Sequence, residues 1–215
     1  MTDLITLTSP QSAAAEAYHS LRTNIGFSSL EKPLKTLLIT SADPDTDKSS
    51  SLANLAIAMA EAGDTVIIVD GDLRRPQQHE IFDLDNQQGV TTWLTENEAV
   101  SLQPTEVNGL TVLTAGPSVA NPVGLLSTKR LTDLLDRLTD QADYILCDAP
   151  PLLSVTDSAL WASAVDGVVL LVNAGGTKRD HAQRAKAILE KVHAHVVGAV
   201  LLNAEQDAAM FGYNG

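Results

Sequence analysis

Residues 34–63 read LKTLLITSADPDTDKSSSLANLAIAMAEAG, and this stretch decides the fold. Its apolar run at 34–40 predicts a buried β-strand, because it is too short for helical periodicity, and the polar segment 41–47 predicts a tight loop. Apolar residues then recur at helical spacing from Leu52 to Met59, so we expect a helix that begins near Lys48 and stops at Gly63. A strand, a polar loop, Lys-Ser and a helix in this order are typical of a phosphate-binding loop, in which backbone N–H groups and a helix N-terminus bind the anion.

The glycines of such a loop are missing. The P-loop pattern G-x-x-x-x-G-K-[ST] would place glycine at positions 42 and 47, where this chain has Ala42 and Asp47, with a second acid at Asp45. Glycine lets the backbone approach a phosphate without a Cβ in the way. Two like charges ~4 Å apart repel by roughly 4 kcal/mol at an effective dielectric constant of ~20, which is about three decades in affinity. We therefore expect Asp45 and Asp47 to weaken nucleotide binding.

Composition and charge limit the class of protein. The chain has 215 residues, 44% of them hydrophobic, which predicts one domain over residues 1–215 with a short lead at 1–10 and a loose tail at 205–215. Its net charge of −13 argues against nucleic-acid binding, which selects clusters of Lys and Arg. No apolar run approaches the roughly 18 residues of a membrane span, so we expect no direct membrane insertion. The single cysteine, Cys147, lies in an apolar run, as expected for a reduced thiol in a cytoplasmic protein.

Apolar and amphipathic segments alternate along the rest of the chain. Continuous β-branched runs indicate strands buried on both faces, and the segments between them have helical spacing. The predicted strands cover residues 64–72, 110–115, 143–148, 167–173 and 196–203, and the predicted helices cover residues 13–28, 76–82, 89–96, 128–141, 154–164 and 178–194. This alternation predicts an α/β fold with one parallel, doubly wound sheet and helices on both faces.

Acidic residues end two of the predicted strands. Asp70 and Asp72 close one strand and Asp148 closes another, at the sheet edge where doubly wound folds bind their ligands. A P-loop enzyme needs a hydroxyl and a carboxylate near Mg²⁺, and a second carboxylate to orient or deprotonate the attacking oxygen. Together with Lys48 and Ser49, these acids supply that set. A lone strand-end Asp is often a turn former, but their order along the chain favours a nucleotide site.

Six longer segments give a more specific indication. They are EAYHSLRTNIGFS, VIIVDGDLRRPQQHEIF, GVTTWL, NPVGLL, YILCDAPP and VVGAVLLN, in this order. Over residues 4–204 the chain resembles the bacterial tyrosine kinases (BY-kinases), cytoplasmic P-loop kinases of capsule and exopolysaccharide assembly. The resemblance implies a MinD-like P-loop fold, ATP and Mg²⁺ as cofactors, and phosphoryl transfer from ATP to tyrosine. It also implies a partner, a membrane polysaccharide co-polymerase (chain-length regulator) whose cytoplasmic tail would recruit the chain to the inner face of the cell membrane.

The resemblance assigns roles to individual residues. It implies that Lys48 holds the β- and γ-phosphates and acts in catalysis with Asp70, the base for the tyrosine hydroxyl, and Asp72. It implies that Mg²⁺ is held by Ser49, Asp72 and Asp148. The implied nucleotide-binding residues are Pro44, Asp45, Thr46, Asp47, Lys48, Ser49, Ser50 and Asn203.

Two further segments depart from the family pattern. The oligomerisation motif E-x-x-R-x-x-R is present as Glu16, His19 and Arg22, so its first arginine is a histidine. We expect these residues at an oligomer interface, although a polar stripe along a helix is also typical of a solvent-exposed face. The tyrosine-rich tail of the family is reduced to Tyr213, the candidate phosphoacceptor. The changes in loop, motif and tail together favour weakened kinase chemistry.

Three functions remain open from the sequence. The first is an active or weakly active tyrosine autokinase that modifies Tyr213. The second is a catalytically inactive pseudokinase, a docking module for the membrane chain-length regulator, favoured by Asp45 and Asp47. The third is a MinD/ParA-like ATPase, which shares the fold but carries a second signature lysine that residues 41–47 lack.

Overall fold

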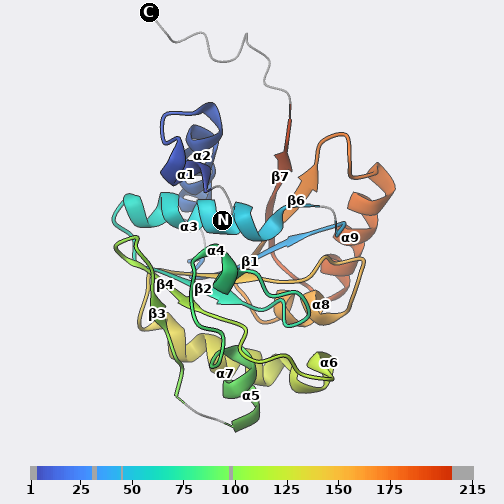
Figure 1. The fold of residues 1–215 in the computed structure, drawn as a ribbon. Helices are drawn as coiled ribbons and strands as arrows, with labels where there is room; N and C mark the ends of the chain where they lie inside the picture. The colour runs from blue at the N-terminus through green and yellow to red at the C-terminus, as the bar shows by residue number, and fades with distance from the viewer. Residues whose placement is uncertain (1–3, 31–32, 45, 97–98, 205–215) are drawn as a thin grey trace, which may run out of the picture.

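A mostly parallel β-sheet lies between two layers of helices (Figure 1). The computed structural model describes residues 4–30, 33–44, 46–96 and 99–204. Within these residues the sheet has seven strands in the order β3–β4–β2–β5–β1–β6–β7, and only the β3–β4 pair is antiparallel. The strands are β1 (Thr36–Ser41), β2 (Val66–Asp70), β3 (Gln103–Pro104), β4 (Leu110–Leu113), β5 (Tyr144–Asp148), β6 (Gly167–Asn173) and β7 (Val196–Leu202). The predicted doubly wound α/β fold is confirmed.

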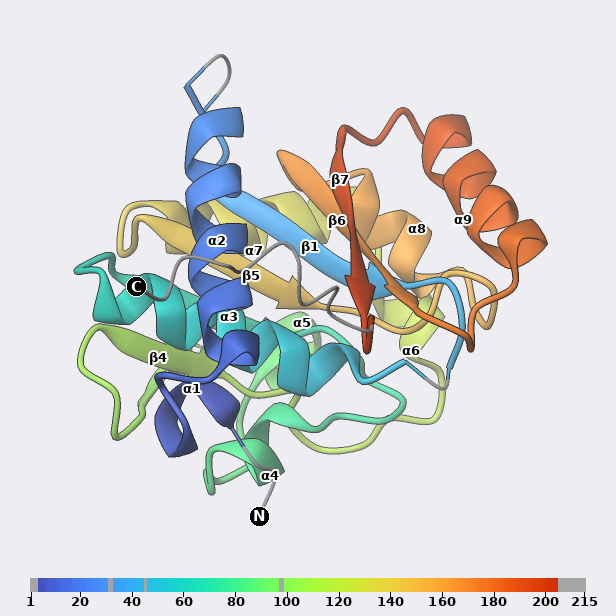
Figure 2. The ribbon, with the colours of Figure 1, turned by 90° about the horizontal axis from the view of Figure 1, so that it is seen from above.

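Helices cover both faces of this sheet (Figures 1 and 2). The helices on one face are α1 (Ile5–Thr8), α2 (Ala13–Ser28), α3 (Lys48–Glu61) and α4 (Gln78–Ile81). The helices on the other side are α5 (Val90–Glu96), α6 (Pro122–Leu125), α7 (Thr128–Thr139), α8 (Asp157–Ala162) and α9 (Arg179–Lys191). Each face therefore has its own apolar core, one built around α3 and the other around α7 and α8.

The helix α3 is the most deeply enclosed of these helices. Residues 48–60 are all buried, because α3 packs on the sheet and is covered in turn by α2. Ser12 caps α2, with its hydroxyl accepting from the Ala15 N–H, and Ile25 of α2 joins the core. At the other end of α3, Gly63 has φ +99, the left-handed conformation that glycine adopts most easily after a helix. The predicted end of this helix is confirmed.

The sheet order brings the predicted site residues to one edge. The strand β5 lies between β1 and β2, and the register pairs Asp148 with both Asp70 and Ile39. Because these strands are parallel, the segments that follow β1, β2 and β5 leave the sheet at the same edge. The phosphate loop and the strand-end acids therefore meet there.

Three short elements were not predicted from the sequence. The helix α1 lies within the expected irregular lead, where Thr6 donates from its N–H and its hydroxyl to the Asn54 side chain of α3. The two-residue strand β3 contains Pro104, which a strand accepts only at an edge or irregularity. The helix α6 is a single turn capped by Asn121. Each of these elements depends on a long-range contact or is too short for a periodic pattern.

Gly71 provides a test of how closely β2 and β5 approach at the site. A Cβ built on Gly71 would lie 2.6 Å from Trp161 Cε2 and 2.7 Å from the Asp148 carbonyl oxygen. We predict that Gly71→Ala lowers the free energy of unfolding by about 1–3 kcal/mol through overpacking. In α2, a Cβ on Gly26 meets nothing within 4 Å, so Gly26→Ala is expected to raise that free energy by up to about 1 kcal/mol. Urea denaturation measures the free energy of unfolding of both variants. Equal effects of the two substitutions would contradict the close approach of β2 to β5 at Gly71.

Candidate functional site

The phosphate loop between β1 and α3 is fastened to its surroundings at both ends. The Ser41 hydroxyl donates to the Asp43 carbonyl oxygen over 2.7 Å, and Asp43 Oδ1 lies 2.6 Å from His181 Nδ1 of α9. At the other end, the Asp47 carbonyl oxygen accepts from the Ser51 hydroxyl over 2.6 Å and from the Ser51 N–H over 3.3 Å. These bonds hold the loop in place without the glycines of the usual pattern.

Asp47 occupies the second glycine position of the pattern without backbone strain. Its φ of −73° is ordinary for an L-residue, and its side chain is exposed. The Asp47 charge acts on Tyr18 of α2, so the two residues are near each other. Burial raises the pKa of Tyr18, a hydrogen bond with Ser51 lowers it, and the Asp47 charge raises it further. Asp47 is also absent from the lining of the cavity described below. Asp47 is therefore a solvent-exposed residue of the loop that is not part of the cavity lining.

Lys48 is the centre of the site. Its ammonium lies 3.0 Å from Asp72 Oδ2 and 3.0 Å from Asp148 Oδ1, and it donates to Ser49 Oγ over 3.2 Å. Burial lowers the pKa of this ammonium, but the charges of Asp148 and Asp72 outweigh burial and raise it. One buried cation thus contacts all three residues that the family resemblance assigns to Mg²⁺.

Asp70 and Asp72 face different surroundings although one residue separates them. Asp70 is fully buried, and its Oδ2 accepts from the N–H groups of Gln77 and Gln78 over 3.0 and 2.9 Å at the start of α4. Burial, and next the charge of Asp148, raises the pKa of Asp70 to about 8. Asp72 lines the cavity. Its Oδ1 accepts from two backbone N–H groups of the following turn, over 3.3 and 3.0 Å.

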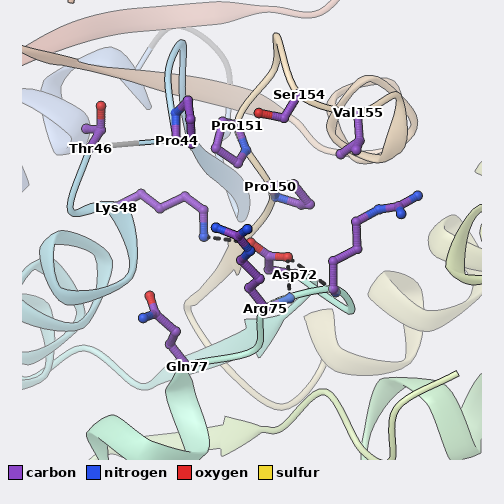
Figure 3. A pocket seen from close by; sticks show the side chains of 11 residues that line it. Pro44, Thr46, Lys48, Asp72, Arg75, Gln77, Pro150, Pro151, Ser154 and Val155 are labelled. Carbon is purple, nitrogen blue, oxygen red and sulfur yellow. Dashed lines mark hydrogen bonds and ion pairs between the residues drawn. The ribbon is translucent and has the colours of Figure 1, made fainter.

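A cavity of about 520 Å³ opens in front of Lys48 and Asp72 (Figure 3). Its lining residues are Pro44, Thr46, Lys48, Asp72, Arg74, Arg75, Gln77, Pro150, Pro151, Ser154 and Val155. Arg74 is fixed against α8 by two bonds to the Asp157 carboxylate, at 2.8 and 3.2 Å. The Arg75 guanidinium points into the cavity (Figure 3) and forms no hydrogen bond or ion pair with another described residue. The volume suits a small anionic ligand or the end of a nucleotide.

The structure brings together some of the predicted site residues and not others. Lys48, Ser49, Asp72 and Asp148 meet around one point, and Pro44 and Thr46 line the cavity beside it. Ser50 is buried in the first turn of α3. Asn203 follows β7, where its amide donates to Asn173 Oδ1 over 2.9 Å, and it does not line the cavity.

Three of the remaining predicted residues lie on α2 and do not line the cavity. Glu16, His19 and Arg22 are on α2, where Glu16 is exposed and the other two are half-buried. Asp45 and Tyr213 lie outside the described residues. The interface and phosphoacceptor roles of these residues stay predictions.

The donor set fits Mg²⁺ held together with a nucleotide. Mg²⁺ is usually bound by one or two carboxylates, water and substrate phosphates rather than by an all-protein cage. Among the described residues, no group of three His, Cys, Asp or Glu side chains is placed to hold a metal alone. Asp72, Asp148 and the Ser49 hydroxyl would hold the ion here. Asp70 Oδ1 is buried without a hydrogen-bond partner among the described residues, so a water on the ion would find a hydrogen-bond partner there.

Two residues of the site were missed by the sequence reasoning. Gln78 is fully buried, and its side-chain amide donates to Asp148 Oδ2 and to the Ser49 carbonyl oxygen. Arg75 supplies the cation that points into the cavity. Both lie in the segment that follows the strand-end acids of β2, so their position after a ligand-bearing strand was the available signal.

The burial of Asp70 predicts a pH-dependent stability. The folded protein holds the Asp70 proton up to about pH 8, whereas the unfolded chain releases it near pH 4. The contribution of Asp70 to stability therefore falls as the pH rises from about 4 to about 8. We expect Asp70→Asn to gain stability relative to the wild type between pH 5.5 and 8.5 in urea denaturation, while the exposed control Asp140→Asn does not. A difference between Asp70→Asn and wild type that is independent of pH would contradict the raised pKa.

Comparisons with known proteins indicate the family of the chain. A family model of P-loop NTPases, described as ParA and NUBPL iron-transfer P-loop NTPase, matches residues 34–205. The chain is 36% identical over 210 residues to the putative tyrosine-protein kinase CapB of Staphylococcus aureus, covering 96% of this chain and 92% of that one. It is 35% identical to the tyrosine-protein kinase YwqD of Bacillus subtilis (strain 168), covering 99% and 91%.

A solved structure supports the same assignment. The crystal structure of the chimerical protein CapA2B2 superimposes with a TM-score of 0.89 at 35% sequence identity, covering 94% of this chain and 90% of that one. Among the helices of the described residues, none is both long enough and apolar enough to cross a bilayer. With a P-loop lysine between two strand-end acids and these relatives over nearly its full length, the chain belongs to the bacterial tyrosine kinase family of P-loop proteins.

Proposed function

We propose that this chain is a BY-kinase domain that binds ATP with Mg²⁺ and transfers the γ-phosphoryl group to a tyrosine hydroxyl. The observation that carries the proposal is the convergence of Lys48 on Asp72, Asp148 and Ser49 beside an open cavity. Phosphoryl transfer depends on positioning and on charge stabilisation more than on covalent chemistry, and these groups supply both. Bound Mg²⁺ would neutralise charge that develops on the phosphates.

The surroundings of each residue indicate its role in phosphoryl transfer. Lys48 would release the two carboxylates and bind the terminal phosphates. Asp72 reaches the cavity, so we assign to it the role of base that accepts the proton of the tyrosine hydroxyl as the new P–O bond forms and the bond to ADP breaks. The family resemblance implies that Asp70 is this base, but its buried carboxylate accepts hydrogen bonds at the start of α4 and does not line the cavity. We assign to Asp70 the positioning of that turn.

Charge in and around the cavity supports binding of an anion at reduced affinity. The Arg75 guanidinium adds to the cavity lining a cation without an acidic partner among the described residues. Asp47 adds a negative charge at the N-terminus of α3. The partial positive charge of this helix end attracts a phosphate, and the Asp47 carboxylate reduces that attraction. Because Asp47 is exposed, solvent screens this charge, and we expect a smaller loss of affinity than the sequence alone predicts.

Removal of the Asp47 charge should tighten nucleotide binding. Even charges as close as about 4 Å repel by only roughly 1 kcal/mol in water, so we predict that Asp47→Gly binds ATP·Mg²⁺ more tightly than the wild type, by up to about fivefold. Isothermal titration calorimetry measures the change, with Asp140→Gly as a control for an exposed acid that does not line the cavity. The double change at Asp45 and Asp47 to glycine is expected to add to the gain. Unchanged or weaker binding by Asp47→Gly would contradict this role of the charge.

Phosphoryl transfer is tested directly with γ-labelled ATP, Mg²⁺ and a tyrosine-containing polypeptide. We expect label on tyrosine from the wild type, and a loss of at least a hundredfold in Lys48→Met and in Asp72→Asn. Lys186→Met removes an exposed lysine from the surface pair with Glu190 and is expected to keep the rate. Transfer that survives Lys48→Met would rule out this site as its origin.

The pseudokinase alternative is favoured by Asp47 and has a distinct outcome in the same assays. ATP·Mg²⁺ binding without label transfer would identify a docking module that keeps the site for nucleotide-controlled binding. Hydrolysis of ATP without transfer to tyrosine would instead favour the MinD/ParA-like ATPase. Either result would replace the kinase proposal.

The family resemblance also supports a cellular setting. We propose that the chain acts on the cytoplasmic side of the membrane in capsule or exopolysaccharide synthesis, bound to the cytoplasmic tail of a polysaccharide chain-length regulator. Glu16, His19 and Arg22 on α2 are the proposed contacts between copies of the chain, with Tyr213 as the candidate acceptor.

A further inference from the structure

Gln78 links the segments that carry Ser49 and Asp148, two of the residues that would hold Mg²⁺, with the end of β2. It is the first residue of α4, and its side chain is 0% exposed. Its Nε2 donates to Asp148 Oδ2 over 2.9 Å and to the Ser49 carbonyl oxygen over 3.2 Å. Its backbone N–H donates to Asp70 Oδ2 over 2.9 Å. One buried residue therefore contacts the ends of β2 and β5 and the first turn of α3.

The surroundings fix the orientation of the Gln78 amide. Both atoms that face Nε2, a carboxylate oxygen and a backbone carbonyl oxygen, are acceptors only. A rotated amide would place Oε1 against those two acceptors, which is unfavourable in a buried site. The amide therefore presents its donors to Asp148 and to α3.

This contact fixes the Asp148 carboxylate so that one of its two oxygens faces the Lys48 ammonium. Oδ1 of Asp148 lies 3.0 Å from the Lys48 ammonium, while Oδ2 is occupied by Gln78. A neutral amide fixes the carboxylate plane and leaves its negative charge available to a cation. An apolar residue at this place would leave Oδ2 buried without this donor and free to rotate.

We propose that Gln78 is a positioning residue that holds Asp148 and the Ser49 turn in the geometry that binds the divalent cation of the nucleotide complex. The proposal rests on the proposed function, because the cation enters with the nucleotide. Partners that orient metal ligands typically change metal affinity by about 10- to 100-fold when they are removed. Gln78 does not line the cavity, so its loss should act on the cation and leave the nucleotide contacts intact.

The test separates metal binding from nucleotide binding in the full chain. Mn²⁺ affinity is measured by electron paramagnetic resonance of the free ion at saturating ADP, and ADP affinity is measured separately in EDTA. We expect Gln78→Met, which fills a similar space without a donor, to weaken Mn²⁺ binding at least tenfold and to change metal-free ADP affinity less than twofold. Gln87→Leu, at an exposed position that does not line the cavity, serves as the control and should match the wild type.

Each outcome has a definite reading. Mn²⁺ affinity within twofold of wild type in a folded Gln78→Met protein overturns the proposal while the proposed function stands. Equal losses of Mn²⁺ and metal-free ADP affinity also overturn it, because they indicate a general structural role. If Gln78→Met yields no folded protein, Gln78→Asn replaces it, since its shorter amide cannot reach both acceptors and should give the same selective loss. A wild-type chain that binds no Mn²⁺ with ADP refutes the proposed function and this inference together.

Discussion

The contacts of Lys48 with Asp72 and Asp148 hold together the segments that meet at the carboxyl edge of the sheet. Removing a charge from water costs several kcal/mol, so buried carboxylates persist only where a cation or hydrogen bonds offset that cost. Lys48 provides the cation. Asp70 avoids the same cost by holding its proton up to about pH 8. The site therefore presents two carboxylates to one ammonium, a balance that a divalent cation and a phosphate could replace.

The order of the strands makes this arrangement possible. Because β5 lies between β1 and β2, the phosphate loop, Asp72 and Asp148 arrive at one edge from three separate parts of the chain. Neutral contacts then set their orientation, with Gln78 joining Asp148 to α3. Gly71 allows the close approach of β2 to β5 and to Trp161. Fold and site thus share the same few residues, and the site's stability cannot be separated from that of the sheet.

Local sequence patterns predicted most of the fold and the charged groups of the site. Continuous apolar runs marked the parallel strands, helical spacing marked α3 and α7, and the strand-end positions of Asp72 and Asp148 placed them beside Lys48. What escaped prediction depends on contacts between distant segments: the Thr6–Asn54 bonds of α1 and the buried amide of Gln78 have no local signature. The exposure of Asp47 outside the cavity lining likewise depends on how the loop packs, which no spacing rule encodes.

We propose that Lys48 exchanges its two carboxylates for nucleotide phosphate when ATP binds. A crystal structure with Mg²⁺ and a non-hydrolysable ATP analogue tests it most directly. We expect the triphosphate against residues 44–49, the Lys48 ammonium on its terminal phosphates, and the metal ion on Ser49, Asp72 or Asp148. An analogue bound elsewhere, or a Lys48 that keeps both carboxylates in the presence of bound nucleotide, would contradict it.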